Sequence, residues 1–300
     1  MDDKVLVAGA TGYLGRFVAQ EFKKRGYWVR ALARNPKKLE HTGPFLEPAT
    51  RKHVDETFVG EVTRLETLHG LCDNIDIVFS SFGRTRQKDK ATFRGVDSQG
   101  NKNILDVALS KSVKKFVYVS VFNAHMLGHL EIVKAHEDFT GALRHSGLDY
   151  AVIHPTGFFS DMSEFLKMAR SGKVYLIGNG ENRINPIHGA DLAAVCVDAV
   201  ASKEREIPVG GPVSYSVNEI AELAFSTLGK SPRVTRIPPR LVGYAVKLVR
   251  PFSRNVSDLA ALFLAAGQND IVAPATDMHT LRSYYQELAP QMLEEKRTAR

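Results

Sequence analysis

The stretch Gly9-Ala10-Thr11-Gly12-Tyr13-Leu14-Gly15 decides the fold, because it directly follows the strand-like run 5–8 and stands where a helix begins. Glycines at such a junction allow close backbone approach to a pyrophosphate, which then meets free N–H groups and the helix dipole. A glycine triplet by itself is also compatible with a simple tight turn. Strand, turn, helix and second strand occur here in the order that a dinucleotide site requires, which favours that site.

Short β-branched runs alternate with amphipathic stretches through the first half of the chain. We expect strands at 5–8, 29–33, 75–79, 116–121 and 150–153, and helices at 16–25, 100–109 and 132–144. The alternation predicts a parallel sheet, and the nearly continuous apolar character of the strands indicates helices on both faces. The expected fold class is therefore α/β, a Rossmann-type doubly wound parallel sheet with a smaller C-terminal substrate region.

The character of the sequence changes after Pro155. We expect a dinucleotide-binding Rossmann domain at 1–155, with 185–202 packing back onto it, and a smaller, mostly helical substrate or partner region at 156–300. One helix of that region is well signalled, because Ser216 and Glu219 have capping-box spacing and Gly229 stands where a C-terminal glycine belongs.

Composition and charge narrow the class of protein. The chain has 300 residues, of which 44% are hydrophobic and 24% charged, as in a globular protein rather than a disordered or fibrous one. The net charge of +7 is scattered over mixed-sign helices apart from clusters at 23–38 and 84–94, so nucleic acid is not an expected partner. Cys72 and Cys196 stand apart without metal spacing and are expected to be buried thiols; no metal site is predicted.

The start of the chain, Met1-Asp2-Asp3-Lys4, lacks the basic and apolar segments of a signal peptide, so we expect a cytoplasmic protein. The longest late apolar stretch, 259–266, is far shorter than the roughly 20 residues of a membrane span, and no transmembrane span is expected.

Arg34 indicates the identity of the dinucleotide. An NAD enzyme usually has an acidic residue at the end of the second strand to accept the ribose 2′-hydroxyl, whereas this chain has Arg34 there, followed by Lys37 and Lys38. A guanidinium pairs well with a 2′-phosphate, so NADP(H) is favoured over NAD(H). The alternative is an arginine in a solvated turn, with NAD admitted through other contacts.

These features resemble the atypical, extended-like (NmrA-like) branch of the short-chain dehydrogenase/reductases over most of the chain. Besides the glycine stretch, the likeness rests on five further segments: 29–34, Val96-Asp97 with Gly100-Asn101, Val117-Tyr118-Val119-Ser120, His154-Pro155-Thr156-Gly157, and 185–192. The resemblance implies that Glu61 lies near the adenine. It also implies that Ser80, Ser81, Phe82 and Gly83 line the ribose, and that Pro155, Thr156, Gly157 and Phe158 flank the nicotinamide, all at the carboxyl ends of strands.

The family normally uses a Tyr-x-x-x-Lys pair, in which the lysine lowers the tyrosine pKa during hydride transfer. Here Lys134 is present but Leu130 replaces the tyrosine, Ser120 matches the upstream serine, and Asp97 stands where many relatives have asparagine. Of the nearby histidines His125, His129 and His136, we keep His129 as a candidate proton donor; ordinary surface histidines are the competing interpretation.

Two segments bear on a substrate. The cluster 84–90 permits an anionic molecule but could be a solvated loop, and the stripe Phe158, Phe159, Met162, Phe165, Met168 could cover an apolar molecule but could be core. The leading hypothesis is an NADP(H)-dependent oxidoreductase acting on a small molecule. The alternatives are a non-catalytic NADP(H)-binding sensor or assembly protein with a protein partner, and an NAD(P)-dependent epimerase. A homo-oligomer is compatible with all three.

Overall fold

The computed structural model describes residues 3–83, 94–128, 130–250, 257, 260–261, 264–265, 267–276 and 278–298. The chain divides into two compact units, one made of 1–154 with 192–207 and the other of 155–191 with 208–300. The cluster 84–94, apart from the backbone of Arg94, and the candidate His129 lie outside the described residues. No helix in the described part of the chain is long and apolar enough to cross a membrane.

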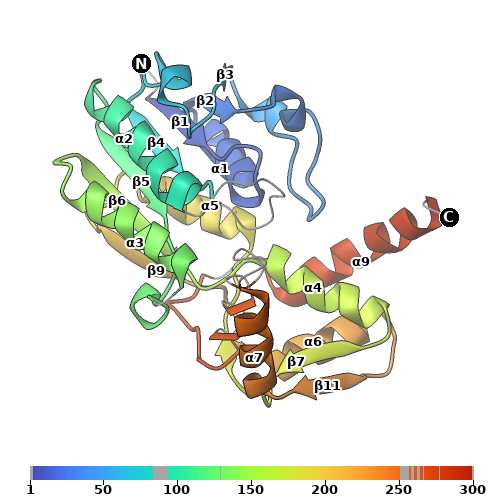
Figure 1. Ribbon diagram of the computed structural model, residues 1–300. Coiled ribbons are helices and arrows are strands. Elements are labelled where there is room, and N and C mark those ends of the chain that lie inside the picture. The colour runs from blue at the N-terminus through green and yellow to red at the C-terminus, as the bar shows by residue number, and fades with distance from the viewer. Residues whose placement is uncertain are drawn as a thin grey trace. The chain divides into compact units, whose positions relative to one another are not determined.

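A parallel sheet forms the centre of the first unit (Figure 1). Among the described residues its strands, in chain order, are β1 (Lys4–Ala8), β2 (Trp28–Ala33), β3 (Glu56–Val59), β4 (Ile77–Ser80), β5 (Lys115–Val119), β6 (Asp149–Pro155) and β9 (Glu206–Val209). Their spatial order is β3-β2-β1-β4-β5-β6-β9. The predicted doubly wound Rossmann-type sheet is confirmed.

Helices cover both faces of this sheet. They are α1 (Tyr13–Lys24), α2 (Asn101–Leu109), α3 (Glu131–Arg144) and α5 (Gly189–Asp198), and α2 follows a π-helical turn, η4 (Arg94–Gly100). Figure 1 shows α2 and α3 together on one face, and an ion pair between Arg25 and Asp198 joins the ends of α1 and α5. The core on the α2–α3 face is aromatic, with the ring centroids of Tyr118 and Phe139 4.6 Å apart.

Strand register sets the position of the site. Ala8 of β1 is paired with Ser80 of β4, Ser80 with Tyr118 of β5, and Tyr118 with Val152 of β6. These strands therefore end at nearly the same level, and the residues that follow them meet at one edge of the sheet.

The second unit packs helices around two small sheets. Its described helices are α4 (Phe159–Arg170), α6 (Val217–Thr227), α7 (Pro239–Val249) and α9 (Leu281–Thr298); its strands are β7 (Val174–Ile177), β8 (Arg183–Ile184), β10 (Tyr215–Ser216) and β11 (Val234–Ile237). β10 pairs with β8 antiparallel, and β11 with β7 parallel. The capping box of α6 is confirmed, because Ser216 Oγ accepts from Glu219 N–H and the Glu219 carboxylate accepts from Ser216 N–H.

Candidate cofactor and active site

From β1 the chain adds β2 and β3 on one side of the sheet, and then β4, β5 and β6 on the other side. The glycine turn follows β1, at the point where the strand order changes direction. Ser81 N–H donates to Ala8 C=O at 3.1 Å, so the ends of the two strands are joined beyond the sheet. Gly9 has φ +97°, and a Cβ added there would lie 2.9 Å from the Phe82 amide nitrogen. Only glycine fits both the backbone angle and the space, and the crevice where open α/β sheets bind ligands begins here.

The other two glycines have different roles. A Cβ on Gly15 would lie 2.1 Å from Gly9 C=O, so Gly15 is required for packing the first turn of α1 against the loop. A Cβ on Gly12 would meet only that same oxygen, at 3.3 Å. Gly12 caps α1 without a side-chain hydrogen bond, and the first turn of α1 contains no acidic residue. The N-terminus of α1 is thus suited to an anion.

Arg16 holds the glycine turn in place through hydrogen bonds that no sequence motif indicates. Its side chain is buried and donates to the carbonyls of Thr11 at 3.2 Å, Pro48 at 3.0 Å and Lys38 at 2.8 Å, and also to that of His41. Burial lowers the pKa of the Arg16 guanidinium from its ordinary value. Arg16 therefore ties the glycine turn to the loop that follows β2, where Arg34 and Lys38 stand.

The predicted contacts to the adenosine ribose gather at the end of β2. Arg34 follows β2 directly, and Lys37 and Lys38 lie in the 3₁₀ turn η1 (Pro36–Leu39), whose first turn Asn35 caps. Arg34 Nη1 lies 3.5 Å from Glu61 Oε2, and both side chains are partly exposed. Glu61 itself follows β3, the neighbour of β2. The structure thus brings together Arg34, which its position after the second strand assigned to the ribose 2′-phosphate, and Glu61, which the resemblance placed near the adenine.

The serines at the strand ends differ in what they contact. Ser80 Oγ donates to Asn101 Oδ1 at 2.6 Å, so its side chain faces α2. The hydroxyl oxygens of Ser81 and Ser120 are buried and have no hydrogen-bond partner among the described residues. A buried hydroxyl without a partner is costly in a folded protein. These two hydroxyls lie just beyond the ends of β4 and β5, at the edge of the sheet where open α/β sheets bind ligands.

Tyr118, His136 and Asp97 form a row of buried polar side chains next to these strand ends. The Tyr118 hydroxyl is 2.6 Å from His136 Nδ1, and His136 Nε2 is 3.6 Å from Asp97 Oδ1. Burial, and then the charge of His154, lowers the pKa of His136 to about 4; burial also raises the pKa of Tyr118 well above its ordinary value. At neutral pH both the phenol and the imidazole are therefore uncharged.

Asp97 connects the row of polar side chains to Gly83, in the segment predicted to line the ribose. It lies in η4 and is completely buried, and a Cβ added to Gly83 would lie 2.7 Å from its Oδ1. The bare backbone of Gly83 is what allows this close approach. The sequence predicted Asp97 as a site residue but gave no signal for the contacts of Tyr118 and His136, because contacts between β5, η4 and α3 have no sequence motif.

Leu130 is the N-cap of α3 and is buried, with 4% of its surface exposed. Lys134 lies one turn further, where its amide donates to Leu130 C=O at 3.0 Å and its Nζ contacts Glu131 Oε1 at 3.2 Å. The position of the family's tyrosine is thus occupied by an apolar side chain that packs inward, while the lysine stays half-exposed.

The predicted nicotinamide segment belongs to the second unit. There Thr156 Oγ1 donates to Asn185 C=O at 2.6 Å, and Gly157 C=O accepts from Ile187 N–H at 2.8 Å. In the apolar stripe only Phe159 is fully buried; Phe158, Met162, Phe165 and Met168 are partly buried, because the inner face of α4 is formed by Phe159, Ser163, Leu166 and Ala169. The stripe is thus mostly not core, and its contact with a substrate stays a prediction.

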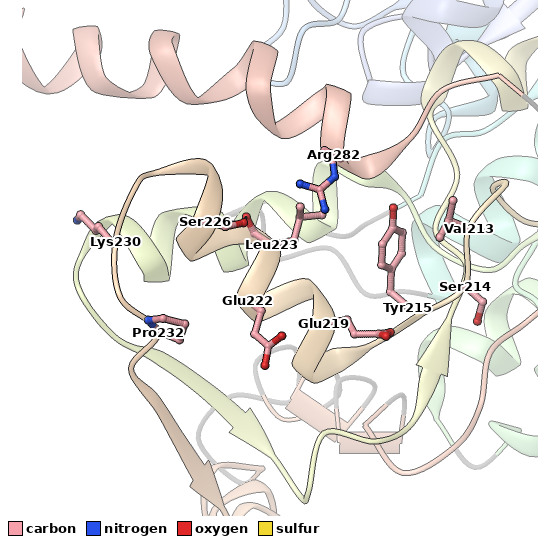
Figure 2. A pocket seen from close by; sticks show the side chains of 10 residues that line it. All are labelled: Val213, Ser214, Tyr215, Glu219, Glu222, Leu223, Ser226, Lys230, Pro232 and Arg282. Carbon is pink, nitrogen blue, oxygen red and sulfur yellow. The ribbon is translucent and has the colours of Figure 1, made fainter.

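A cavity of about 510 Å³ also opens in the second unit, beside α6 and the start of α9 (Figure 2). Its charged lining groups are Glu219, Glu222, Lys230 and Arg282. Two of them are already engaged: Glu219 in the capping box and Lys230 in bonds to the carbonyls of Ala169 and Arg170. This lining is of mixed sign and holds the helices together, so we do not assign the cavity to the dinucleotide.

His188, Asp191 and His279 form a second polar cluster in this unit, with donor atoms within 4.8 Å of one another, close enough to hold a metal ion. His279 Nδ1 lies 2.6 Å from Asp191 Oδ1, and the two imidazole rings stack with centroids 4.3 Å apart. No local spacing in the sequence indicates the cluster, because His279 is 88 residues from Asp191. The absence of a metal site stays a prediction.

Comparison with known proteins agrees with this geometry. Residues 9–203, which include the glycine turn, Arg34 and the strand-end serines, match a family model described as NAD(P)H-binding. The chain belongs to this NAD(P)H-binding family. The resemblance that the glycine pattern indicated is confirmed, and so is the nicotinamide dinucleotide as cofactor. The turn that only glycine fits and the two hydroxyls without a partner among the described residues suit such a ligand.

The names of individual relatives indicate different functions, a reductase in one group and an assembly factor in another. The chain is 27% identical to the chloroplastic divinyl chlorophyllide a 8-vinyl-reductase of Arabidopsis thaliana over 89% of its length, and spans 66% of that protein. It is 28% identical to the photosystem II assembly factor Ycf39 of Synechocystis over 95% of its length and 90% of that protein. The NADPH-dependent quinone oxidoreductase QOR2 of Escherichia coli, solved with NADPH, superposes with a TM-score of 0.69 at 17% identity, covering 97% of this chain and 99% of that one. The last likeness shows the fold alone.

Proposed function

We propose that this protein is an NADPH-dependent oxidoreductase that acts on a small organic molecule. The observation that carries the proposal is the pair of buried hydroxyls, Ser81 and Ser120, that lack a partner at the carboxyl ends of β4 and β5. Hydroxyl groups without a partner at this edge suit a ligand held in the crevice. The named reductase among the relatives supports the same class of reaction.

Preference for NADPH over NADH is assigned to Arg34, with Lys38 as a second cation on the same loop. A 2′-phosphate accepts charge-assisted hydrogen bonds from a guanidinium, whereas a ribose hydroxyl gains little from it. Glu61 opposes this preference, because its carboxylate contacts Arg34 at 3.5 Å and would lie near the same phosphate. The pyrophosphate is assigned to the amide end of α1, at Gly12, Tyr13 and Leu14.

The bound cofactor would supply the hydride, and the protein has to hold the substrate and manage a proton. We assign Ser120 as a hydrogen-bond donor to the substrate, and Lys134 as the cation near the ribose. Leu130 cannot move a proton. Of the three histidines, His136 rather than His129 is proposed to support the chemistry, as a positioning residue that holds the Asp97 carboxylate beside Gly83.

A second candidate function is a non-catalytic NADPH-binding sensor or assembly protein. The buried Leu130 in place of tyrosine favours it, and one group of relatives is named as assembly factors. The epimerase hypothesis requires the same missing tyrosine and gains no separate support. In each case the substrate, protein partner, oligomeric state and cytoplasmic location stay predictions.

Isotope transfer distinguishes the two candidates. The protein is mixed with NADPH deuterated on either face of C4 and with a deproteinised cell extract, and the extract is then analysed by mass spectrometry. An oxidoreductase should place deuterium from one face into one metabolite, and Ser120→Ala should reduce the transfer while NADPH still binds. Saturating NADPH binding without any transfer would reject the oxidoreductase proposal in favour of the sensor.

A further inference from the structure

Helix α7 carries an apolar face that points away from the protein. Leu241, Tyr244 and Leu248 have 59%, 66% and 73% of their surface exposed. Their spacing of three and four residues places them on one side of the helix, within about 60° of one another at 100° per residue. None of the eleven side chains of α7, all of which the structure describes, is buried.

The opposite side of α7 is the one that packs. Val242, Gly243 and Val246 are partly covered, Val246 C=O accepts from Ser257 Oγ at 3.1 Å, and Gly243 lies next to Leu264. The helix is thus held to its own unit by one face while an apolar ridge is turned outward. Clustered large apolar side chains on a surface mark a site of association.

Charge identifies the surface that fits this ridge. From Arg233 to Arg250 the sequence contains five cations, Arg233, Arg236, Arg240, Lys247 and Arg250, and no acidic residue. Arg240 and Lys247 flank the ridge on its Tyr244 side. Two copies of such a helix would repel each other. An anionic lipid surface instead attracts the cations while the leucines enter the boundary between headgroups and acyl chains, with tyrosine at the interface.

We propose that α7 is a peripheral membrane-docking helix that places Leu241, Tyr244 and Leu248 into an anionic bilayer surface. The helix has 11 residues and lies on the surface rather than crossing the bilayer. The proposal is independent of the function assigned to the nucleotide site.

Vesicle flotation of the full chain tests this proposal. The wild type should float with phosphatidylcholine vesicles that contain about one third phosphatidylglycerol, and not with pure phosphatidylcholine vesicles, and added salt should weaken the binding. The double variant Leu241→Glu/Leu248→Glu should lower the partition coefficient at least about tenfold. The triple variant Arg240→Gln/Lys247→Gln/Arg250→Gln should lower it about a hundredfold.

The control is Leu109→Glu, which places the same charge on an exposed leucine of α2 and should leave flotation unchanged. Because the substituted side chains are exposed, thermal unfolding and NADPH binding should match the wild type in every variant. Absence of wild-type flotation at low salt would overturn the proposal, as would flotation that both α7 variants retain. A dimer that the leucine variant dissociates, with no vesicle binding, would assign the ridge to a second copy instead.

Discussion

Arg34 and Glu61, to which we assign the preference between NADPH and NADH, lie 3.5 Å apart at the position predicted for the adenosine ribose. The sequence sufficed to select Arg34, because the end of the second strand is fixed relative to the glycine turn. It did not suffice for Arg16, whose acceptors are backbone carbonyls far apart in the chain. Because every residue has a carbonyl oxygen, such acceptors cannot be recognised from the residue types in the sequence.

Arg34→Ala should weaken NADPH binding about 10- to 100-fold while NADH binding changes little, because one or two charge-assisted hydrogen bonds to the phosphate are lost. Glu61→Gln should strengthen NADPH binding a few-fold, since an opposing carboxylate is removed. Calorimetric titration with both nucleotides measures this. Arg51→Ala, which removes a half-exposed arginine paired with Glu40, serves as the control. Equal losses for NADPH and NADH in Arg34→Ala would refute the assigned role.

His136 should make stability depend on pH. Its pKa falls from 6.5 to about 4 on folding, so the unfolded chain binds an extra proton between these values. The stability is fully present above about pH 6.5 and is lost as the pH falls toward 4, by about 3 kcal/mol. Urea unfolding at pH 7 and pH 4 should show a smaller loss of unfolding free energy in His136→Asn than in the wild type. Parallel pH profiles for His136→Asn and wild type would contradict this account.

The same histidine tests the proposed positioning role. If His136 acts by holding Asp97 beside Gly83, His136→Asn should preserve more of the maximal turnover than His136→Leu, since an amide can still donate to the carboxylate. A purely structural residue would instead show equal kcat values for the two variants once both are folded.

At the scale of elements, the buried strands were predictable and the edge strands were not. β1, β4 and β5 are continuous buried runs, whereas β3 and β9 lie at the sheet's edges and their side chains are mostly half-exposed or exposed. An edge strand needs no apolar run, and therefore has a weak signal. The helix expected at 16–25 begins three residues earlier, at Tyr13, because Gly12 is its N-cap.

Two glycines of the β1–α1 turn should have different roles: Gly15 is needed for packing, and Gly12 for cofactor binding. Gly15→Ala should unfold or strongly destabilise the protein, since its Cβ would lie 2.1 Å from Gly9 C=O. Gly12→Ala meets that oxygen only at 3.3 Å and should cost little stability, but the methyl group should obstruct the pyrophosphate. Thermal unfolding and NADPH titration of both variants separate the effects. A Gly12→Ala protein that binds NADPH normally would contradict this division.

Helix α6 has well-defined ends. Besides the capping box, Gly229 has φ +63°, with Gly229 N–H donating to Ser226 C=O at 3.1 Å and Lys230 N–H donating to Phe225 C=O at 3.0 Å, the pattern of a Schellman motif. Ser216→Ala should therefore destabilise α6 by about 1 kcal/mol. Hydrogen exchange of the α6 amides measures this, with Ser171→Ala at the exposed end of α4 as the control. Unchanged exchange in Ser216→Ala would contradict the assigned cap.

At the scale of the whole molecule, the residues that follow the family pattern and Leu130, which departs from it, lie in different parts of the first unit. The glycine turn, Arg34 and the strand-end serines follow strand order, so the sequence alone could place them. Leu130, Tyr118 and His136 lie where the family's tyrosine is missing, and the contact of Tyr118 with His136 and Phe139 depends on how α3 packs on β5. Packing of this kind is set by shape rather than by a motif, so the contact between Tyr118 and His136 could not be predicted from the sequence.

The measurement that most directly tests the central claim is calorimetric titration of the wild type and Gly12→Asp with NADPH and NADH. The account predicts saturable binding of one NADPH per chain, tighter than NADH, and loss of both in Gly12→Asp, where a carboxylate would face the pyrophosphate while the fold and its thermal unfolding are kept. Wild-type NADPH affinity in a folded Gly12→Asp protein, or tighter binding of NADH than of NADPH by the wild type, would contradict it.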